Sequence, residues 1–293
     1  MIEEFEGLDF VQADVFAEGP LSGNGLSVFL DCAQLSASLM QRLSVEMRQF
    51  ESIFLIPGKD PQCARARIFT MEEELEFAGH PLLGAACVLH DRKGEATALE
   101  TWCFELTEKS ITVETERLAA GFKAVMRQGM PSFGEPLSAE RAAPYLKALN
   151  LAESDLEPGL PLQMVSTGLP YLLVPIRSGL ADVKTLHDDF EGLLAEIGAK
   201  FSYVLDVPAL EGRTWDNLGL VEDIATGSAA GPVGAYLVRH GRAEVGSEII
   251  LSQGRFVGRP SKLTIKVLAT QNHIEDVHVG GGVHIVARGR FGR

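Results

Sequence analysis

The chain has 293 residues, of which 46% are hydrophobic and 23% charged, and its formal net charge is −14 at pH 7. This composition is typical of a globular protein that is long enough for two domains with their own cores. The negative charge argues against nucleic acid and anionic membrane as partners, because both require a basic surface. No stretch approaches the roughly 18 consecutive apolar residues of a membrane span, and the acidic residues 1–6 are unlike a secretory signal. We therefore expect a cytoplasmic protein.

Short apolar and alternating segments predict strands through most of the first half. They cover residues 8–16, 27–30, 53–56, 65–70, 101–106, 111–114 and 122–126. An amphipathic helix is predicted over residues 38–49, where apolar residues recur every three to four positions. Glu51 follows at the junction between this helix and the next strand.

The second half repeats this mixture after residues 130–136, whose turn-forming composition predicts a domain boundary. Helices are predicted over 138–149 and 188–197, and strands over 172–176, 201–207, 249–251, 263–267, 277–279 and 284–286. The pattern predicts an α+β fold, with a mostly antiparallel sheet wrapped on one central helix in each half. The predicted halves are residues 1–130 and 131–293, and the last strand is free to return to the first half.

Two turns, at residues 79–81 and 226–228, each lead into a helix of small residues. Pro81 is of the type found at a first helical position. Thr226 and Ser228 are of the type found at a helix N-cap. Such helix starts carry free backbone N–H groups, which suit an anion such as a substrate carboxylate or an enolate oxygen.

The two turns belong to an internal repeat. Gly79 and Gly227 lie 148 residues apart, and at this offset residues 68–89 correspond to residues 216–237. A repeat of half the chain predicts two copies of one supersecondary unit, facing each other with the helix starts at a shared cleft.

Three side chains near these turns are candidates for acid–base chemistry. Glu51 has apolar neighbours, and a carboxylate in an apolar cleft can take a proton from carbon and return it elsewhere. On the residues alone, a solvated surface glutamate is the commoner interpretation of Glu51. His80 suits either a proton partner or a helix cap. Asp223 suits a partner of His80 or of a substrate amine, or an acid that balances the dipole of the following helix.

Other candidate chemistries receive less support. The four cysteines contain no C-x-x-C pair, so we interpret them as reduced and mostly buried rather than as a zinc site or a disulfide framework. Ser228 lacks the spacing of a nucleophile elbow. His278 and His284 have no third ligand nearby, so we expect no metal site. Residues 280–282, three glycines, indicate backbone crowding or a bulge rather than a phosphate loop.

Six motifs in this order resemble the PhzF-type phenazine-biosynthesis family, and the resemblance spans nearly the whole chain. They are Gly23-Asn24 before a strand, Glu51 followed by an apolar strand, Phe77-Ala78-Gly79-His80-Pro81, Glu222-Asp223-x-Ala225-Thr226-Gly227-Ser228-Ala229, Gln253-Gly254 with Gly258-Arg259-Pro260-Ser261, and Val279-Gly280-Gly281.

The resemblance implies the diaminopimelate-epimerase-like fold, with two similar halves and an active site between them. The named member of that family is an isomerase of dihydro-3-hydroxyanthranilate. The resemblance therefore implies acid–base isomerase chemistry on a small carboxylated substrate, without metal or organic cofactor, in a homodimer. It implies Glu51, His80 and Asp223 as catalytic residues. The substrate-binding residues that it implies are Asn24, Gly79, Thr226, Gly227 and Ser228.

The chain departs from the family pattern at Phe50, Gly25 and Ile224. Phe50 precedes the implied catalytic carboxylate, so the physiological substrate stays open. An epimerase or racemase on the same fold is an alternative, but relatives of that kind use a cysteine from each half, and the two turns contain none. Cys87 lies about two turns inside its helix. A non-catalytic protein that binds a small ligand is the third hypothesis.

Overall fold

The computed structural model describes residues 5–94, 97–216, 218–271 and 273–292. They divide into two compact units, one formed by Met1–Arg127 with Gly280–Arg293 and the other by Gln128–Val279. The division falls three residues before the predicted boundary at residue 130. The division also assigns the end of the chain to the first unit. Strand β16 (His273–Arg290) therefore has residues in both units.

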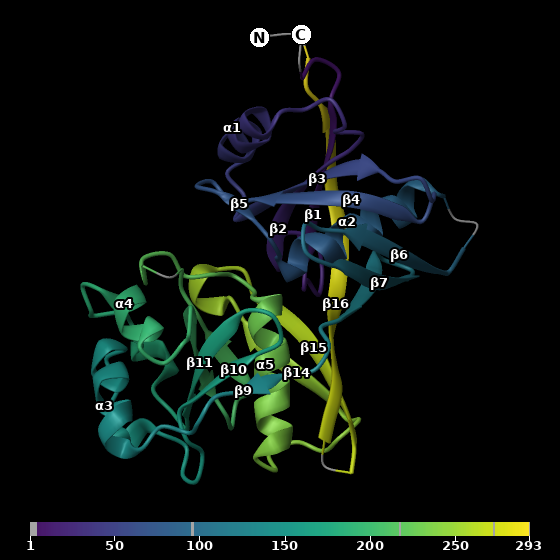
Figure 1. The fold of residues 1–293 in the computed structure, drawn as a ribbon. Helices are drawn as coiled ribbons and strands as arrows, with labels where there is room; N and C mark the ends of the chain where they lie inside the picture. Colours follow the sequence, from purple (N-terminus) through teal and green to yellow (C-terminus); the bar gives the residue numbers. More distant parts are fainter. Residues whose placement is uncertain (1–4, 95–96, 217, 272, 293) are drawn as a thin grey trace. The chain divides into compact units, whose positions relative to one another are not determined.

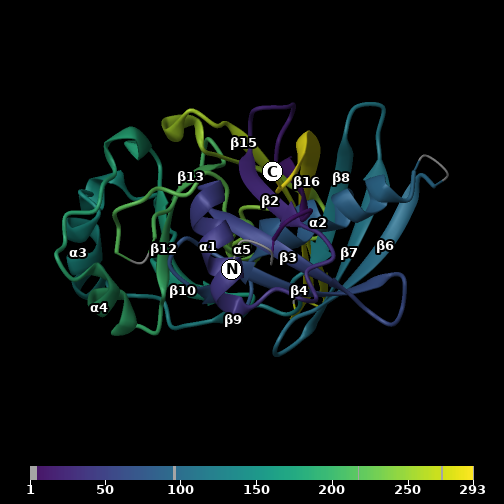
Figure 2. The same ribbon diagram turned by 90° about the horizontal axis from the view of Figure 1, so that it is seen from above.

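The first unit is a closed ring of strands around one helix (Figure 1). The strand order is β1-β2-β3-β4-β6-β7-β8-β16, and β16 also pairs with β1. Strands β6, β7 and β8 run side by side in Figure 2. The elements are β1 (Asp9–Val15), β2 (Asn24–Phe29), α1 (Ala37–Met47), β3 (Glu51–Pro57), β4 (Cys63–Phe69), β5 (Glu74–Leu75), α2 (Gly79–Arg92), β6 (Leu99–Glu105), β7 (Ser110–Arg117) and β8 (Phe122–Arg127).

Helix α2 is central to this ring because its sequence is apolar all round and rich in small residues. It contacts strands β1, β2, β3, β6, β7 and β8. A Cβ atom at Gly84 would overlap the side chains of Leu26 and Val15, so glycine lets the helix approach β1 and β2. The helix starts at Gly79, so Pro81 is its third residue. The sequence had predicted Pro81 at the first helical position. Proline is accepted there because no first-turn N–H has an intrahelical partner.

Strand β16 runs straight through the three glycines that were expected between two separate strands. The two strands predicted at residues 277–279 and 284–286 are parts of one strand, because β16 extends over the whole of His273–Arg290. The predicted crowding is found, since a Cβ at Gly280 would meet the carbonyl oxygen of Ala124, and one at Gly282 that of Ala17. Glycine here keeps the strand extended between close neighbours.

The second unit is a sheet in the order β16-β15-β14-β13-β12-β11-β10-β9, covered by helices. Helix α5 contacts β10, β11 and β15. Helices α3 and α4 pack on β11 and β12 through one apolar cluster that includes Leu146, Phe190 and Val174. The elements are β9 (Ser132–Phe133), α3 (Ala139–Ala148), β10 (Gln163–Ser166), β11 (Pro170–Ile176), α4 (Phe190–Ala195), β12 (Phe201–Asp206), β13 (Glu211–Arg213), α5 (Gly227–Arg239), β14 (Glu248–Gln253), β15 (Ser261–Thr270) and the 3₁₀ turns Glu153–Asp155, Leu180–Asp182 and Arg255–Val257.

The two units share one order of strand pairings. In the first unit, β2 and β3 pair in parallel across α1, and β4 and β6 pair in parallel across α2. In the second, β11 and β12 pair in parallel across α4, and β13 and β14 across α5. Helices α2 and α5 begin at Gly79 and Gly227, the two residues that the sequence repeat matches. The α+β fold of two similar curled sheets, each with a central helix, is thus as predicted.

No helix in the described part of the chain is both long enough and apolar enough to cross a membrane.

Candidate active site

Glu51 and His80 come together inside the first unit. Glu51 is the first residue of β3, paired in register with Leu26 of β2, and His80 is the second residue of α2. The Nε2 atom of His80 lies 3.3 Å from Oε2 of Glu51, and the two side chains are 4% and 11% exposed. The ring of strands thus brings a carboxyl group and an imidazole, distant in sequence, into one buried pair. A solvated surface position for Glu51 is contradicted by this burial.

The imidazole of His80 is neutral at pH 7. Burial lowers its pKa from the ordinary value of 6.5 to about 3, because desolvation disfavours the charged form. A neutral imidazole has one nitrogen that accepts a proton and one that donates. The pair therefore has the parts for moving a proton, with a carboxyl group that gives or takes it and a ring that stays uncharged.

This pKa predicts how stability depends on pH. Between about pH 6.5 and pH 3, the unfolded chain binds a proton at His80 and the folded chain does not. The free energy of unfolding is therefore expected to fall as the pH is lowered through this window, by up to about 1.4 kcal/mol per pH unit. Above about pH 6.5 the contribution is fully present.

The measurement is urea unfolding at several values between about pH 6.5 and 5, followed by the fluorescence of Trp102, which lies in the first unit. We expect the slope to flatten in His80→Asn and to be unchanged in His273→Asn, since His273 is exposed. Equal slopes in the wild-type protein and His80→Asn would contradict the buried neutral imidazole.

The predicted binding residues Asn24 and Gly79 also belong to the first unit. Asn24 is fully buried at the start of β2, where it pairs with Val15 of β1. Gly79 opens α2 after Ala78, whose extended backbone forms the N-cap without a side-chain hydrogen bond. The first-turn N–H groups of α2 thus receive no side-chain cap from this residue.

The other predicted residues, Asp223 and residues 226–228, belong to the second unit. Thr226 is the N-cap residue of α5, but its hydroxyl does not cap the helix. It donates to Oδ2 of Asp223 instead. Thr226 thus occupies the N-cap position that its residue type predicts, but its hydroxyl oxygen accepts from Nε2 of Gln253 rather than from a helix N–H.

Gln253 fixes this arrangement and was absent from the predicted site residues. Its Nε2 donates to the backbone oxygen of Asp223 and to Oγ1 of Thr226, at 3.0 Å each. Its Oε1 accepts from the N–H of Thr226 at 3.2 Å and from the hydroxyl of Tyr203 at 3.1 Å. Since Thr226 Oγ1 accepts from Gln253, its own proton is directed to Asp223, which is thereby held as the acceptor.

Replacing Gln253 by Leu is expected to lower the free energy of unfolding by about 2–3 kcal/mol. The change keeps the volume but leaves Thr226 N–H and the Tyr203 hydroxyl buried without this partner, and unsatisfied buried groups cost about 1–3 kcal/mol. Tyr203→Phe removes one of the four bonds and should cost about 1 kcal/mol. Urea unfolding followed by Trp215 fluorescence measures both. Equal losses would show that the amide network contributes little beyond packing.

Ser228 and Gly227 are engaged at the start of α5. The hydroxyl of Ser228 lies 2.7 Å from that of Tyr171, and the backbone oxygen of Gly227 accepts from Nε2 of Gln128 at 2.8 Å. Thr167 donates in turn to Gln128. A hydroxyl paired with tyrosine has no general base in these bonds, so Ser228 is better suited to binding than to nucleophilic attack.

A buried ion pair lies next to Asp223 and had no signal in the sequence. Arg213 donates from Nε and Nη2 to the two carboxylate oxygens of Glu222, at 2.9 and 2.6 Å. Its Nη1 donates to the backbone oxygens of Leu180 and Val183. Each side chain is 10% exposed. This pair anchors the residue that precedes Asp223 to the 3₁₀ turn of the same unit.

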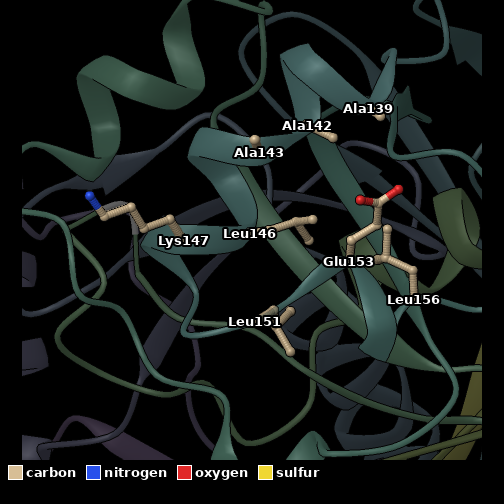
Figure 3. Close-up of a pocket in the computed structure, with 8 residues that line it drawn as sticks. All are labelled: Ala139, Ala142, Ala143, Leu146, Lys147, Leu151, Glu153 and Leu156. Carbon is tan, nitrogen blue, oxygen red and sulfur yellow. The ribbon is translucent and has the colours of Figure 1, made fainter.

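Other candidates lie apart from these residues. His278 pairs with Asp276 at 3.0 Å, and within the described ranges no three or more His, Cys, Asp or Glu side chains are grouped to hold a metal ion. A surface pocket of about 180 Å³ lies against α3 in the second unit (Figure 3). Its lining is mostly apolar, with Lys147 and Glu153, and includes none of the predicted site residues.

Comparison with known proteins finds relatives that match nearly the whole chain. A trans-2,3-dihydro-3-hydroxyanthranilate isomerase of Pseudomonas chlororaphis is 34% identical over 96% of this chain and 98% of its own. The solved structure of a predicted epimerase from Pseudomonas aeruginosa is 49% identical, with a TM-score of 0.90 over 97% of this chain and 99% of that one. A hydroxyproline epimerase from Agrobacterium vitis, 14% identical, shares the fold, with a TM-score of 0.68 over 99% and 93% of the chains.

The protein is an isomerase, since curated relatives matched over nearly their whole length bear that name. It belongs to the PhzC-PhzF family of phenazine biosynthesis-like proteins, which matches residues 13–289. The predicted family and the diaminopimelate-epimerase-like fold are thereby confirmed.

Proposed function

We propose that the protein moves a hydrogen on a small carboxylated substrate by acid–base catalysis, without metal or organic cofactor. The buried pair of Glu51 and His80 carries this proposal, because a carboxyl group beside a neutral imidazole can exchange a proton with carbon. The Glu51 carboxylate takes a proton from one carbon, the electron pair delocalises along a conjugated system, and the proton returns at another carbon. The atoms and charge of the substrate are unchanged overall.

The remaining residues have binding roles in this proposal. Asp223, held by Thr226 and Gln253, orients the substrate or its amine. The N-cap residues of α2 and α5 make no side-chain cap, so the first-turn N–H groups suit a substrate carboxylate. Ser228 and Asn24 add a hydroxyl and an amide. The name of the Pseudomonas chlororaphis relative makes trans-2,3-dihydro-3-hydroxyanthranilate the first candidate substrate.

The test is hydrogen exchange in D₂O. The full chain is incubated with this candidate and with a panel of small unsaturated or amino-bearing carboxylic acids, and deuterium at carbon is followed by NMR. We expect uptake at a carbon of at least one compound, with a shifted double bond in the product. Tight binding of a panel member without exchange would instead support a ligand-binding protein.

The same experiment separates an epimerase, which would invert one centre and leave the double bonds in place. The structure gives little support for that chemistry through cysteine. Cys87 is the cysteine of α2, and it is fully buried, with a pKa raised well above its ordinary value by desolvation. A thiol of this kind holds its proton and does not act as a base near pH 7.

A further inference from the structure

Two of the four cysteines face each other across neighbouring strands of the first unit. Cys63 starts β4, Cys103 lies in β6, and the two are register partners in a parallel pairing. Register partners on adjacent strands point to the same face of the sheet. Both residues are half-buried. Arg65 and Glu105, which lie two positions further along each strand and so on the same face, are exposed. The thiols therefore share the solvent-side face of this pair of strands.

The spacing suits a covalent bond between the sulfurs. Adjacent strands lie about 4.7–4.9 Å apart, and disulfides join Cα atoms about 4.4–6.8 Å apart. The two thiols are already in hydrogen-bonding contact, and this contact is the main reason that the pKa of Cys63 is raised to about 11. Cys63 accordingly keeps its proton near pH 7.

The other two cysteines differ from this pair in burial. Cys32 and Cys87 are both fully buried, and desolvation raises the pKa of Cys32 to about 12. Buried thiols of this kind are inert. Cys63 instead lines a surface pocket of about 270 Å³, together with residues such as Gly58 and Lys93. The half-buried sulfurs of Cys63 and Cys103 are therefore more open to a small oxidant than the two fully buried thiols.

We propose that Cys63 and Cys103 form a reversible thiol–disulfide site, which closes in the presence of a low-molecular-weight disulfide and ties β4 to β6. One thiol of the pair loses its proton, attacks one sulfur of the small disulfide and releases one small thiol. The other protein sulfur then attacks the protein sulfur of the mixed disulfide and releases the second small thiol. The small disulfide is reduced by two electrons, its two sulfurs take up the protons, and one protein disulfide forms.

The bond spans the crossover that contains α2. It joins two residues 40 positions apart in the chain, and the loop that it closes carries His80 at the start of the helix. Closing a loop of this length restricts the unfolded chain and stabilises the folded one. The oxidised first unit is therefore expected to melt at a higher temperature than the reduced one, and the inference stands apart from the proposed reaction.

The experiment titrates the full chain with glutathione disulfide against glutathione, blocks free thiols with N-ethylmaleimide and maps the peptides by mass spectrometry. We expect a Cys63–Cys103 peptide pair, a mass loss of about 2 Da relative to the dithiol, full reversal by dithiothreitol and a melting temperature raised by about 5 °C or more. Cys63→Ser and Cys103→Ser are the matched controls and should show no internal bond and no rise.

Three results would overturn the proposal or part of it. One is that the wild-type protein forms only glutathione adducts at Cys63 or Cys103, without an internal disulfide, and thus behaves as the two single variants do. Another is that the linked peptides contain Cys32 or Cys87, which would show that the unit opens before it oxidises. A bond that forms without any change in melting temperature would overturn the expected tie of β4 to β6.

Discussion

Glu51→Gln is expected to slow the exchange of carbon-bound hydrogen by about 10³-fold or more, because acid–base groups contribute about 10²–10⁴-fold to catalysed proton transfer. Gln keeps the size of the side chain and a polar contact to His80, which lies 3.3 Å from the carboxyl oxygen. It lacks the basic oxygen that takes the proton. The loss should appear in kcat, measured by NMR of deuterium uptake, with little change in KM because the substrate-binding groups remain.

Glu46→Gln is the matched control, since Glu46 lies on α1 and is exposed. The two variants lose the same charge, so a global electrostatic effect would slow both equally. Glu51→Asp is a further variant for comparison, because it keeps a carboxylate but moves it back by the length of one methylene group. If Glu51→Gln exchanged hydrogen as fast as the wild-type protein, the proton would be carried by another group and the proposed role of Glu51 would be abandoned.

The sequence predicted the fold well wherever the signal was local. Helices α2 and α5 begin at the two glycines that the repeat aligns. Their signals, which are small residues, an early proline and a helical apolar pattern, all lie within one short segment of the sequence. The continuous strand β16 was missed for the opposite reason. Whether glycines break a strand depends on the backbones that crowd them, here those of Ala124 and Ala17, and these are distant in sequence.

The same limit applies to the site. Glu51 and His80 were named as single residues, and only the ring of strands shows that they form one pair. Gln253 was visible as part of a motif, but its role depends on Tyr203 and Thr226, which lie on other elements of the second unit. Pairings of this kind depend on register, and register is set by which face of each strand is buried and by the turns that join the strands, rather than by local propensity.

The repeat places different chemistry at matched positions. At the offset of 148 residues, His80 of α2 corresponds to Ser228 of α5. The first helix start has a neutral imidazole beside a carboxyl group, and the second has a hydroxyl bonded to that of Tyr171. In the proposed function, the first helix start supplies the parts for proton transfer and the second supplies hydrogen-bonding groups for binding. The two helix starts thus share one local scaffold and differ in their side chains.

Arg213→Met is expected to lower the free energy of unfolding by about 3–5 kcal/mol, the cost of removing one partner of a buried ion pair. Arg213 and Glu222 are each 10% exposed, so the change leaves a carboxylate in a poorly hydrated position. It also removes the donors to the backbone oxygens of Leu180 and Val183. Urea unfolding followed by the fluorescence of Trp215, which lies in the second unit, reports the loss.

A second Arg–Glu pair of the same unit provides the control. Arg255 and Glu211 are also 2.6 Å apart, and their carboxylate is similarly buried (12% exposed), but Arg255 is 57% exposed. Because water screens the exposed arginine, Arg255→Met should cost less stability than Arg213→Met. Adding Glu222→Leu to Arg213→Met should recover part of the loss, since the stranded charge disappears. If both arginine variants lose the same stability, burial does not decide the strength of these pairs, and Arg213 is not the anchor of the segment that precedes Asp223.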